Sequence, residues 1–297
     1  MRVALVTGGS GLVGRALIVR LRGSGVRVLA TARSLSAERA VTEAGAEPLH
    51  TDLANLGEWA GEAAEADVLF HLGLPRLTTP LRPVGARRRA RAAGSDAASL
   101  ASIAGDRPVV LASSGLRYGD RAEPAVDDDP APGGPVLARV AAAAEQGLAG
   151  PALRAVRLPW VYGPGGLMRE LIVGLRVRRR RVVGRGDNRW ALIGAEDAAA
   201  ALVAAAGAPP GVYTAADPVV PTQLEVIQTL CTVPDLRRPD HAPLRLAALG
   251  MGGAMVEALA TSLSIRTGRL ADHGWAPAGD WRRDLVTLAE RPLPLAG

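Results

Sequence analysis

The residues with the clearest chemical potential are glycines close to the start of the chain. They lie in the run Thr7-Gly8-Gly9-Ser10-Gly11-Leu12-Val13-Gly14, directly after a short apolar stretch. Glycines at this spacing permit a tight turn and let backbone N–H groups approach a pyrophosphate, which the N-terminus of a following helix attracts. The run predicts a dinucleotide-binding loop, against the alternative of a glycine-rich turn without a ligand. The expected contacts are Gly8, Gly9, Ser10, Gly11, Leu12 and Val13.

The residues that follow the second expected strand indicate which dinucleotide binds. An acidic residue usually binds the ribose 2′-hydroxyl there, but this chain has Thr31, Arg33 and Ser34. A guanidinium and hydroxyls suit a 2′-phosphate, so we expect NADPH, with NADH as the alternative. The competing interpretation is a solvated loop arginine in an arginine-rich chain. We also expect Asp52 and Leu53 beside the adenine, unless Asp52 only caps the next helix.

The chain contains no lysine, and all 35 of its basic side chains are arginine. This excludes a phosphate loop of the GKS/GKT type and Schiff-base chemistry, because both need a lysine amine. The single cysteine, Cys231, excludes a disulfide framework and a cysteine-rich zinc site. The run Asp127–Asp129 has no metal geometry and is interpreted as a solvated loop. We therefore expect no metal.

The elements that must position these residues follow a strand–helix alternation over the first 115 residues, typical of a parallel sheet. Helices are expected at Leu12–Leu21, Pro135–Gly147, Ala198–Ala206, Gln223–Thr232 and Leu244–Leu263. Strands are expected at Arg2–Thr7, Val26–Thr31, Glu47–Leu49, Asp67–Leu72, Pro108–Ala112, Ala152–Leu158 and Gly211–Thr214.

The fold class that this pattern predicts is α/β, a Rossmann-like doubly wound parallel sheet with a smaller mixed C-terminal part. The expected domains are 1–160 with 187–215 for the dinucleotide, and 161–186 with 216–297 for the substrate.

The net charge of +6 could suggest a nucleic-acid partner. We discount this interpretation, because exclusive use of arginine together with abundant alanine and glycine indicates a coding bias. The longest uncharged stretch contains Pro209 and Pro210, so we expect no membrane span. The sequence favours a cytoplasmic protein with a small-molecule partner.

Separated segments across most of the chain resemble the extended short-chain dehydrogenase/reductase family, which is related to nucleotide-sugar epimerases. The segments are TGGSGLVG (Thr7–Gly14), HTDL (His50–Leu53), DVLFHLG (Asp67–Gly73), LASSGLRYGD (Leu111–Asp120), RLPWVYGPG (Arg157–Gly165), GAEDAAAALVAA (Gly194–Ala205) and GVYTAADP (Gly211–Pro218). The resemblance implies that Leu72, Gly73, Leu74, Ser113, Pro159 and Val161 lie along the dinucleotide.

The same resemblance shows that the family's catalytic pair is missing. The family uses a tyrosine followed four residues later by a lysine, on a helix that also carries a glutamate. If that glutamate is Glu145, the pair falls on Leu137 and Ala141. The family's serine is retained as Ser114, which the resemblance assigns to hydrogen bonding of a substrate carbonyl.

Three functions remain open on this evidence. The first is an atypical ketoreductase that reduces a ketone of a polycyclic aromatic polyketide, where a neighbouring phenol stabilises the developing alkoxide. This combination is similar to ketoreductases that act on angucyclinones in antibiotic biosynthesis. The second is a non-catalytic NAD(P)-binding sensor or regulatory protein. The third is a nucleotide-sugar epimerase or dehydratase, which the missing tyrosine disfavours.

Further candidate residues each have a structural alternative. Met251, Met255, Trp275 and Trp281 are expected either to line an apolar pocket or to form ordinary core. Tyr162 and His71 are weighed as substitute acids but favoured as structural residues. The glycine-flanked stretch Gly163–Gly186 is considered as a lid.

Overall fold

The computed structural model describes residues 1–51, 60–74, 83–121, 123–177 and 181–291. Its strands are β1 (Val3–Thr7), β2 (Arg27–Thr31), β3 (Glu47–Leu49), β4 (Val68–His71), β5 (Val109–Ser114), β6 (Leu153–Leu158), β7 (Trp160–Tyr162), β8 (Val182–Val183), β9 (Leu192–Gly194), β10 (Gly211–Thr214) and β11 (His241–Ala242). Its helices are α1 (Leu12–Gly23), α2 (Leu35–Glu43), α3 (Ala60–Ala64), α4 (Pro83–Ala104), α5 (Ala138–Gly147), α6 (Gly166–Arg176), α7 (Ala195–Gly207), α8 (Gln223–Leu230), α9 (Leu244–Met251), α10 (Gly253–Ala260) and α11 (Trp281–Glu290). Two short 3-10 helices, η2 (Gly115–Tyr118) and η3 (Arg269–His273), complete the set.

Seven strands form one parallel sheet in the order β10-β6-β5-β4-β1-β2-β3. The chain order reverses between β1 and β4, which is where doubly wound sheets bind ligands beyond the carboxyl ends of their strands. The fold class expected from the sequence, an α/β Rossmann-like doubly wound parallel sheet, is therefore confirmed.

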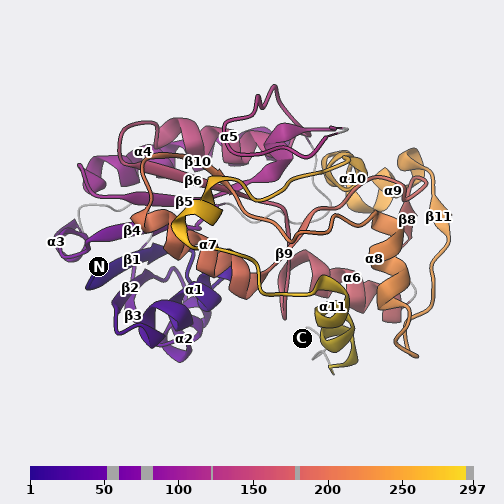
Figure 1. Cartoon of the computed structure of the whole chain (residues 1–297), viewed down its shortest axis with the longest axis horizontal. Helices are drawn as coiled ribbons and strands as arrows, with labels where there is room; N and C mark the ends of the chain where they lie inside the picture. Colours follow the sequence, from indigo (N-terminus) through magenta and orange to yellow (C-terminus); the bar gives the residue numbers. More distant parts are fainter. Residues whose placement is uncertain (52–59, 75–82, 122, 178–180, 292–297) are drawn as a thin grey trace.

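Helices cover both faces of this sheet (Figure 1) because successive residues of a buried strand point to opposite sides. Ala4 and Val6 of β1 pack with α1 and α7, whereas Leu5 between them packs with α4 and α5. Both sides are apolar, which explains why the strands consist of nearly continuous aliphatic runs.

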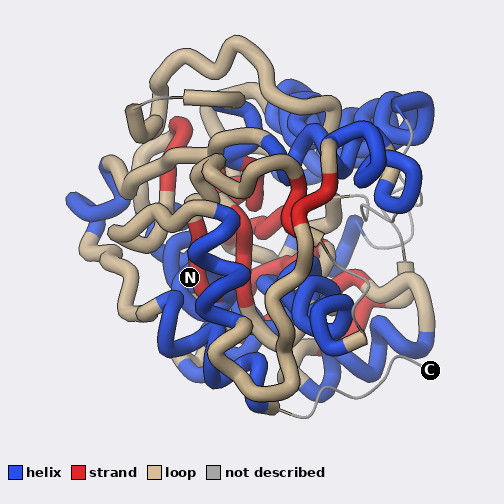
Figure 2. The backbone as a smooth tube through the Cα atoms, turned by 90° about the vertical axis from the view of Figure 1, so that its right-hand side faces the viewer, coloured by secondary structure: helices blue, strands red, loops and turns tan. Residues whose placement is uncertain are grey.

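A third cluster of buried side chains lies beyond the sheet, among α6, α8, α10 and α11. It contains Ile172, Leu230, Met255 and Leu285, each less than a tenth exposed. Figure 2, turned so that this part faces the viewer, shows helices around an interior of strands. No helix in the described residues is long and apolar enough to cross a membrane.

The structure corrects two sequence predictions about local structure. The expected single helix Leu244–Leu263 is two helices, because Gly252 adopts a φ of +81° and breaks the chain direction between α9 and α10. Asp127 is not solvated but buried, where its carboxylate accepts N–H hydrogen bonds from Thr214 (2.9 Å) and Arg269 (2.7 Å). A carboxylate with such partners tolerates burial.

Candidate functional site

The glycine run forms a sharp turn between β1 and α1. Gly8 has a φ of +73°, and its carbonyl accepts the N–H of Gly11 at 3.0 Å. A Cβ on Gly8 would lie 2.5 Å from the carbonyl carbon of Leu72, so only glycine fits there. Gly11 is the N-cap of α1 and has no side chain to occupy the helix N-terminus. The turn therefore presents bare backbone N–H groups at a positive helix end, as a pyrophosphate requires.

Gly14 gives a direct test of this loop. A Cβ there would clash with the Gly8 carbonyl oxygen and lie 2.8 Å from the Gly9 Cα, so Gly14→Ala must displace the loop. We expect NADPH affinity, measured by calorimetric titration, to fall on the order of 100-fold because the donors are misplaced. Gly23→Ala at the other end of α1 is the control, since nothing lies within 4 Å of its added Cβ. Equal affinities for Gly14→Ala and Gly23→Ala would remove the loop from the binding site.

Several other predicted dinucleotide contacts lie at the same edge of the sheet. Ser10, Leu12 and Val13 are half-buried at the start of α1, and Leu72, Gly73 and Leu74 follow β4 directly. The Thr7 hydroxyl is 2.7 Å from His71 Nδ1, which ties the ends of β1 and β4 together. His71 is fully buried, and burial lowers its pKa to about 4, so the ring is neutral at physiological pH. His71 is thus packed beneath the loop and is not placed to act as an acid.

The predicted adenosine end is partly described. Thr31 is the last residue of β2, and Arg33 is exposed just beyond it. Ser34 is the N-cap of α2, and its Oγ accepts the Ala37 N–H at 3.2 Å. The Ser34 Oγ also lies 3.1 Å from the Ser36 Oγ, and either hydroxyl can donate to the other. Asp52 and Leu53 lie outside the described residues.

The helix expected to carry the family's acid–base pair is α5. It begins at Ala138 instead of Pro135, and both Leu137 and Ala141 are buried apolar residues. Glu145 is also buried on α5 and accepts two hydrogen bonds from Arg157, at 3.1 and 3.0 Å. The helix thus has a glutamate where the family has one, but Leu137 and Ala141, at the positions of the tyrosine and the lysine, cannot titrate.

Ser113 and Ser114 end β5 beside this helix but serve different partners. The Ser113 hydroxyl donates to Glu145 on the α5 side of the sheet. The Ser114 Oγ accepts the Leu116 N–H at 3.2 Å, and its hydroxyl proton remains free to donate to a carbonyl oxygen. Ser114 pairs in register with Leu158, which precedes the predicted nicotinamide segment Pro159–Val161.

Tyr162 follows this segment and is unsuited to proton donation. Its hydroxyl donates to Asp217 at 3.1 Å and to Asp284 at 3.4 Å. Burial and the neighbouring carboxylate of Asp217 raise the pKa of Tyr162 far above its ordinary value. The structural interpretation of Tyr162 is therefore the appropriate one.

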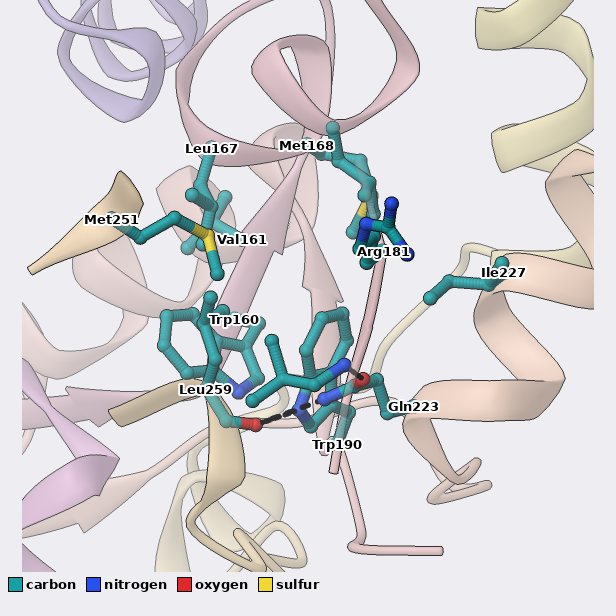
Figure 3. A pocket seen from close by; sticks show the side chains of 12 residues that line it. Trp160, Val161, Leu167, Met168, Arg181, Trp190, Gln223, Ile227, Met251 and Leu259 are labelled. Atoms are coloured by element: carbon teal, nitrogen blue, oxygen red, sulfur yellow. Dashed lines mark hydrogen bonds between the residues drawn. The ribbon is translucent and has the colours of Figure 1, made fainter. Parts of the chain in front are cut away.

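An apolar cavity lies beside Trp160 and Val161, the residues that follow Pro159 in the chain (Figure 3). Its volume is about 70 Å³, and its walls come from β7, α6, β8, α8, α9 and α10. The lining residues are Trp160, Val161, Leu167, Met168, Leu171, Arg181, Val183, Trp190, Gln223, Ile227, Met251 and Leu259. The ring centroids of Trp160 and Trp190 lie 5.9 Å apart. The cavity is therefore lined for an apolar group.

The polar side-chain groups of this cavity differ in whether they have a hydrogen-bond partner. Gln223 accepts the Val183 N–H at 2.7 Å and donates to the Leu259 carbonyl at 3.1 Å. Trp190 Nε1 donates to the same carbonyl at 3.0 Å. Trp160 Nε1 is buried and has no hydrogen-bond partner among the described residues.

The apolar residues singled out in the sequence divide between the cavity and the core. Met251 lines the cavity, whereas Met255 and Trp281 are buried in the C-terminal core. Trp275 packs on the α7 side of the sheet and donates to the Asp197 carbonyl at 3.1 Å. Sequence reasoning missed the contribution of α6, although Leu167, Met168, Leu171, Ile172 and Leu175 have helical spacing. The stretch weighed as a lid thus contains a helix packed into the C-terminal core.

The chain matches the model of the NAD dependent epimerase/dehydratase family over residues 4–216. No curated protein matches it significantly. The solved structures similar to it include the human epimerase family protein SDR39U1 with NADPH, at 20% identity, covering 98% of this chain and 100% of that one, with a TM-score of 0.81.

Two further similar structures are enzymes named for nucleotide sugars. The UDP-glucose 4-epimerase of Thermotoga maritima is 16% identical, with 97% of each chain covered and a TM-score of 0.74. The dTDP-glucose 4,6-dehydratase of Bacillus anthracis with NAD is 13% identical, covering 98% of this chain and 96% of that one, with a TM-score of 0.77. At these identities the structures establish a shared fold. The family match over most of the chain establishes more: the protein belongs to the NAD dependent epimerase/dehydratase family of NAD(P)-binding enzymes.

Proposed function

We propose that this chain is an NADPH-dependent ketoreductase that acts on a polycyclic aromatic polyketide, and that it works without the tyrosine–lysine pair. The observation that carries the proposal is the combination of two features. Apolar Leu137, the N-cap of α5, and apolar Ala141 within α5 stand at the positions of the pair. An apolar cavity walled by Trp160 and Trp190 opens beside Val161. Residues 161–186 and 216–297 would then bind the substrate.

The glycine loop supports dinucleotide binding, because side chains at Gly8 and Gly14 would collide with the backbone of Leu72 and of the loop itself and so disturb the turn that a pyrophosphate approaches. Arg33, exposed two residues beyond the end of β2, would bind a 2′-phosphate, which supports NADPH over NADH. When held by these residues, NADPH would supply the hydride that reduces the carbonyl carbon of the substrate.

The protein groups have a limited part in the chemistry. In this proposal Ser114 donates a hydrogen bond to the ketone oxygen, which finally gains a proton from water, giving an alcohol. In a substrate with a phenol beside the ketone, the internal hydrogen bond stabilises the alkoxide that hydride addition creates. The tryptophan-walled cavity holds the ring that bears the ketone, so that positioning contributes most of the rate.

The apolar cavity distinguishes this proposal from a nucleotide-sugar epimerase or dehydratase. Sugar hydroxyls need several hydrogen-bonding groups, whereas Gln223 is already occupied by backbone partners. Epimerase chemistry also needs a base that removes a hydroxyl proton. The choice of an angucyclinone as substrate class rests on the resemblance of the sequence to the ketoreductase of simocyclinone biosynthesis.

The direct test is NADPH oxidation with a panel of aromatic polyketide ketones, together with an NADPH-binding titration. We expect binding and turnover of at least one tetracyclic ketone that carries an adjacent phenol. Loss of the tyrosine–lysine pair also fits a non-catalytic NAD(P)-binding sensor. Tight NADPH binding without turnover of any ketone in the panel would favour the sensor.

Ser114→Ala tests the one protein donor proposed for the ketone. Because the variant removes a neutral hydrogen bond, we expect kcat to fall roughly 5- to 15-fold, with little change in NADPH affinity. Steady-state kinetics with a saturating tetracyclic ketone measure the effect. Ser102→Ala on the exposed face of α4 is the matched control. An unchanged kcat would remove Ser114 from the reaction.

Arg33→Ala tests the choice of dinucleotide. Loss of a charge-assisted contact with the 2′-phosphate should weaken NADPH binding roughly 10- to 100-fold and leave NADH binding almost unchanged. Titration with both dinucleotides measures the preference. Arg39→Ala, farther along α2, is the control for a general loss of positive charge. A variant that retains the full NADPH preference would contradict this role.

A further inference from the structure

A second cavity adjoins the tryptophan-walled one. It has a volume of about 410 Å³ and is more open, and it lies against α9 and β11. Its lining residues are Arg181, His241, Ala242, Pro243, Leu246, Ala247, Gly250 and Met251. Arg181 and Met251 line both cavities. We call the first the inner cavity and the second the outer groove.

The sizes of the two spaces limit what each can hold. Small-molecule sites in proteins usually measure about 300–1,000 Å³. The inner cavity, at about 70 Å³, is well below that range, whereas the outer groove, at about 410 Å³, is within it. A polycyclic ketone with a ring between the tryptophans and Met251 must therefore extend into the outer groove.

Met251 and Arg181, which lie at the junction of the two spaces, have long unbranched side chains that can adopt several rotamers. Methionine is unbranched and adapts to irregular shapes. Met251 is the last residue of α9, immediately before the break at Gly252. The Arg181 side chain is 62% exposed, and its nearest carboxylate oxygen, on Asp240, is 3.9 Å away. Figure 3 shows Met251 and Arg181 on opposite sides of the inner cavity.

The chemistry of the outer groove complements that of the inner cavity. Pro243, Leu246 and Ala247 give it an apolar wall. Arg181 and His241 are the ionisable side chains among its described lining, and His241 Nδ1 is 3.0 Å from the Gly184 carbonyl oxygen. The groove therefore favours an apolar group that carries a hydrogen-bond acceptor near Arg181.

We propose that the inner cavity and the outer groove form one elongated substrate site, with Met251 and Arg181 at the junction. The inner cavity takes the ring that bears the ketone, and the outer groove takes an apolar substituent of the same molecule with an acceptor opposite Arg181. This inference rests on the proposed ketoreductase function. It assigns Met251 as a residue that determines substrate length.

The test compares a short and a long substrate in the full-length protein. The short one is 8-hydroxy-1-tetralone, and the long one is a tetracyclic angucyclinone ketone with a further substituent. We expect Met251→Trp to close the junction, lowering kcat/KM at least tenfold for the long ketone and less than threefold for the short one. Leu249→Trp is the matched control, because Leu249 is 83% exposed on the same helix and lines neither space.

Equal losses for the two ketones, or no loss for either, would overturn the elongated site. Equilibrium dialysis of both ketones in the presence of NADPH separates this outcome from failure of the proposed function. If the unsubstituted protein reduces neither ketone but binds both, and Met251→Trp weakens only the long one, the ketoreductase proposal fails and the elongated site stands. If Met251→Trp binds the long ketone as tightly as the unsubstituted protein does, the elongated site fails.

Discussion

Glu145→Ala is expected to lower the free energy of unfolding by about 3–5 kcal/mol, because it leaves two guanidinium groups without their carboxylate inside the protein. Arg157 and Arg117 both form ion pairs with Glu145, and Ser113 donates to it. Burial and the neighbouring charge of Arg157 already lower the pKa of Arg117. Removing Glu145 would strengthen this repulsion.

Chemical denaturation monitored by circular dichroism measures the change. The matched control is Glu47→Ala, because Glu47 pairs with Arg27 on the surface, where both side chains are about half exposed. We expect the control to change stability by about 1 kcal/mol or less. Equal effects of the two substitutions would show that the Glu145 network is no more important than a surface pair.

The position of this network connects stability to the site. It joins the end of β5, the following η2 and β6 to α5, the helix that lacks the family's catalytic pair. Ser114, the proposed donor to the ketone, directly follows Ser113. A variant that retains the fold but loses the network should therefore also misplace Ser114 relative to Val161.

We expect the stability of the protein to decrease as pH rises toward 7, and we expect Asp217→Asn to remove this decrease. Asp217 is 2% exposed, and burial raises its pKa to about 7, while Asp197, Asp284 and Asp280 add repulsion. The Tyr162 hydroxyl donates to it, which opposes the rise. The folded state thus favours the protonated acid.

The direction follows from proton linkage. Between about pH 4 and pH 7 the folded state holds a proton that the unfolded state has lost, so stability falls by about 1.4 kcal/mol per pH unit and then levels off. From pH 4 to pH 7.5 this amounts to about 4 kcal/mol, which Asp217→Asn should eliminate. Urea denaturation at several pH values measures it. Asp128→Asn, on a side chain 63% exposed, is the control, and a slope unchanged in Asp217→Asn would contradict the assignment.

The sheet and its dinucleotide loop could be predicted from local sequence. The strands are short aliphatic runs buried on both faces, and Gly8 and Gly14 permit a turn that other residues would block. The family resemblance identified Leu137 and Ala141 as the replaced pair, and the structure places both in a buried position on or next to α5.

The substrate cavity could be predicted only in part, because its walls come from segments distant in sequence. Trp160 and Trp190 meet through the pairing of β7 with β9. Whether a methionine lines a cavity or fills the core depends on which face of its helix packs inward. Met251 and Met255 differ in this way because the chain turns at Gly252.

The central claim is that this protein transfers a hydride from NADPH to an aromatic ketone without a tyrosine–lysine pair. The most direct measurement incubates the protein with a tetracyclic ketone and NADPH deuterated at the transferred position, followed by mass spectrometry and NMR of the product. We predict one deuterium at the new carbinol carbon, with one NADPH consumed per alcohol formed. Recovery of unchanged ketone from a protein that binds both NADPH and the ketone would contradict the claim.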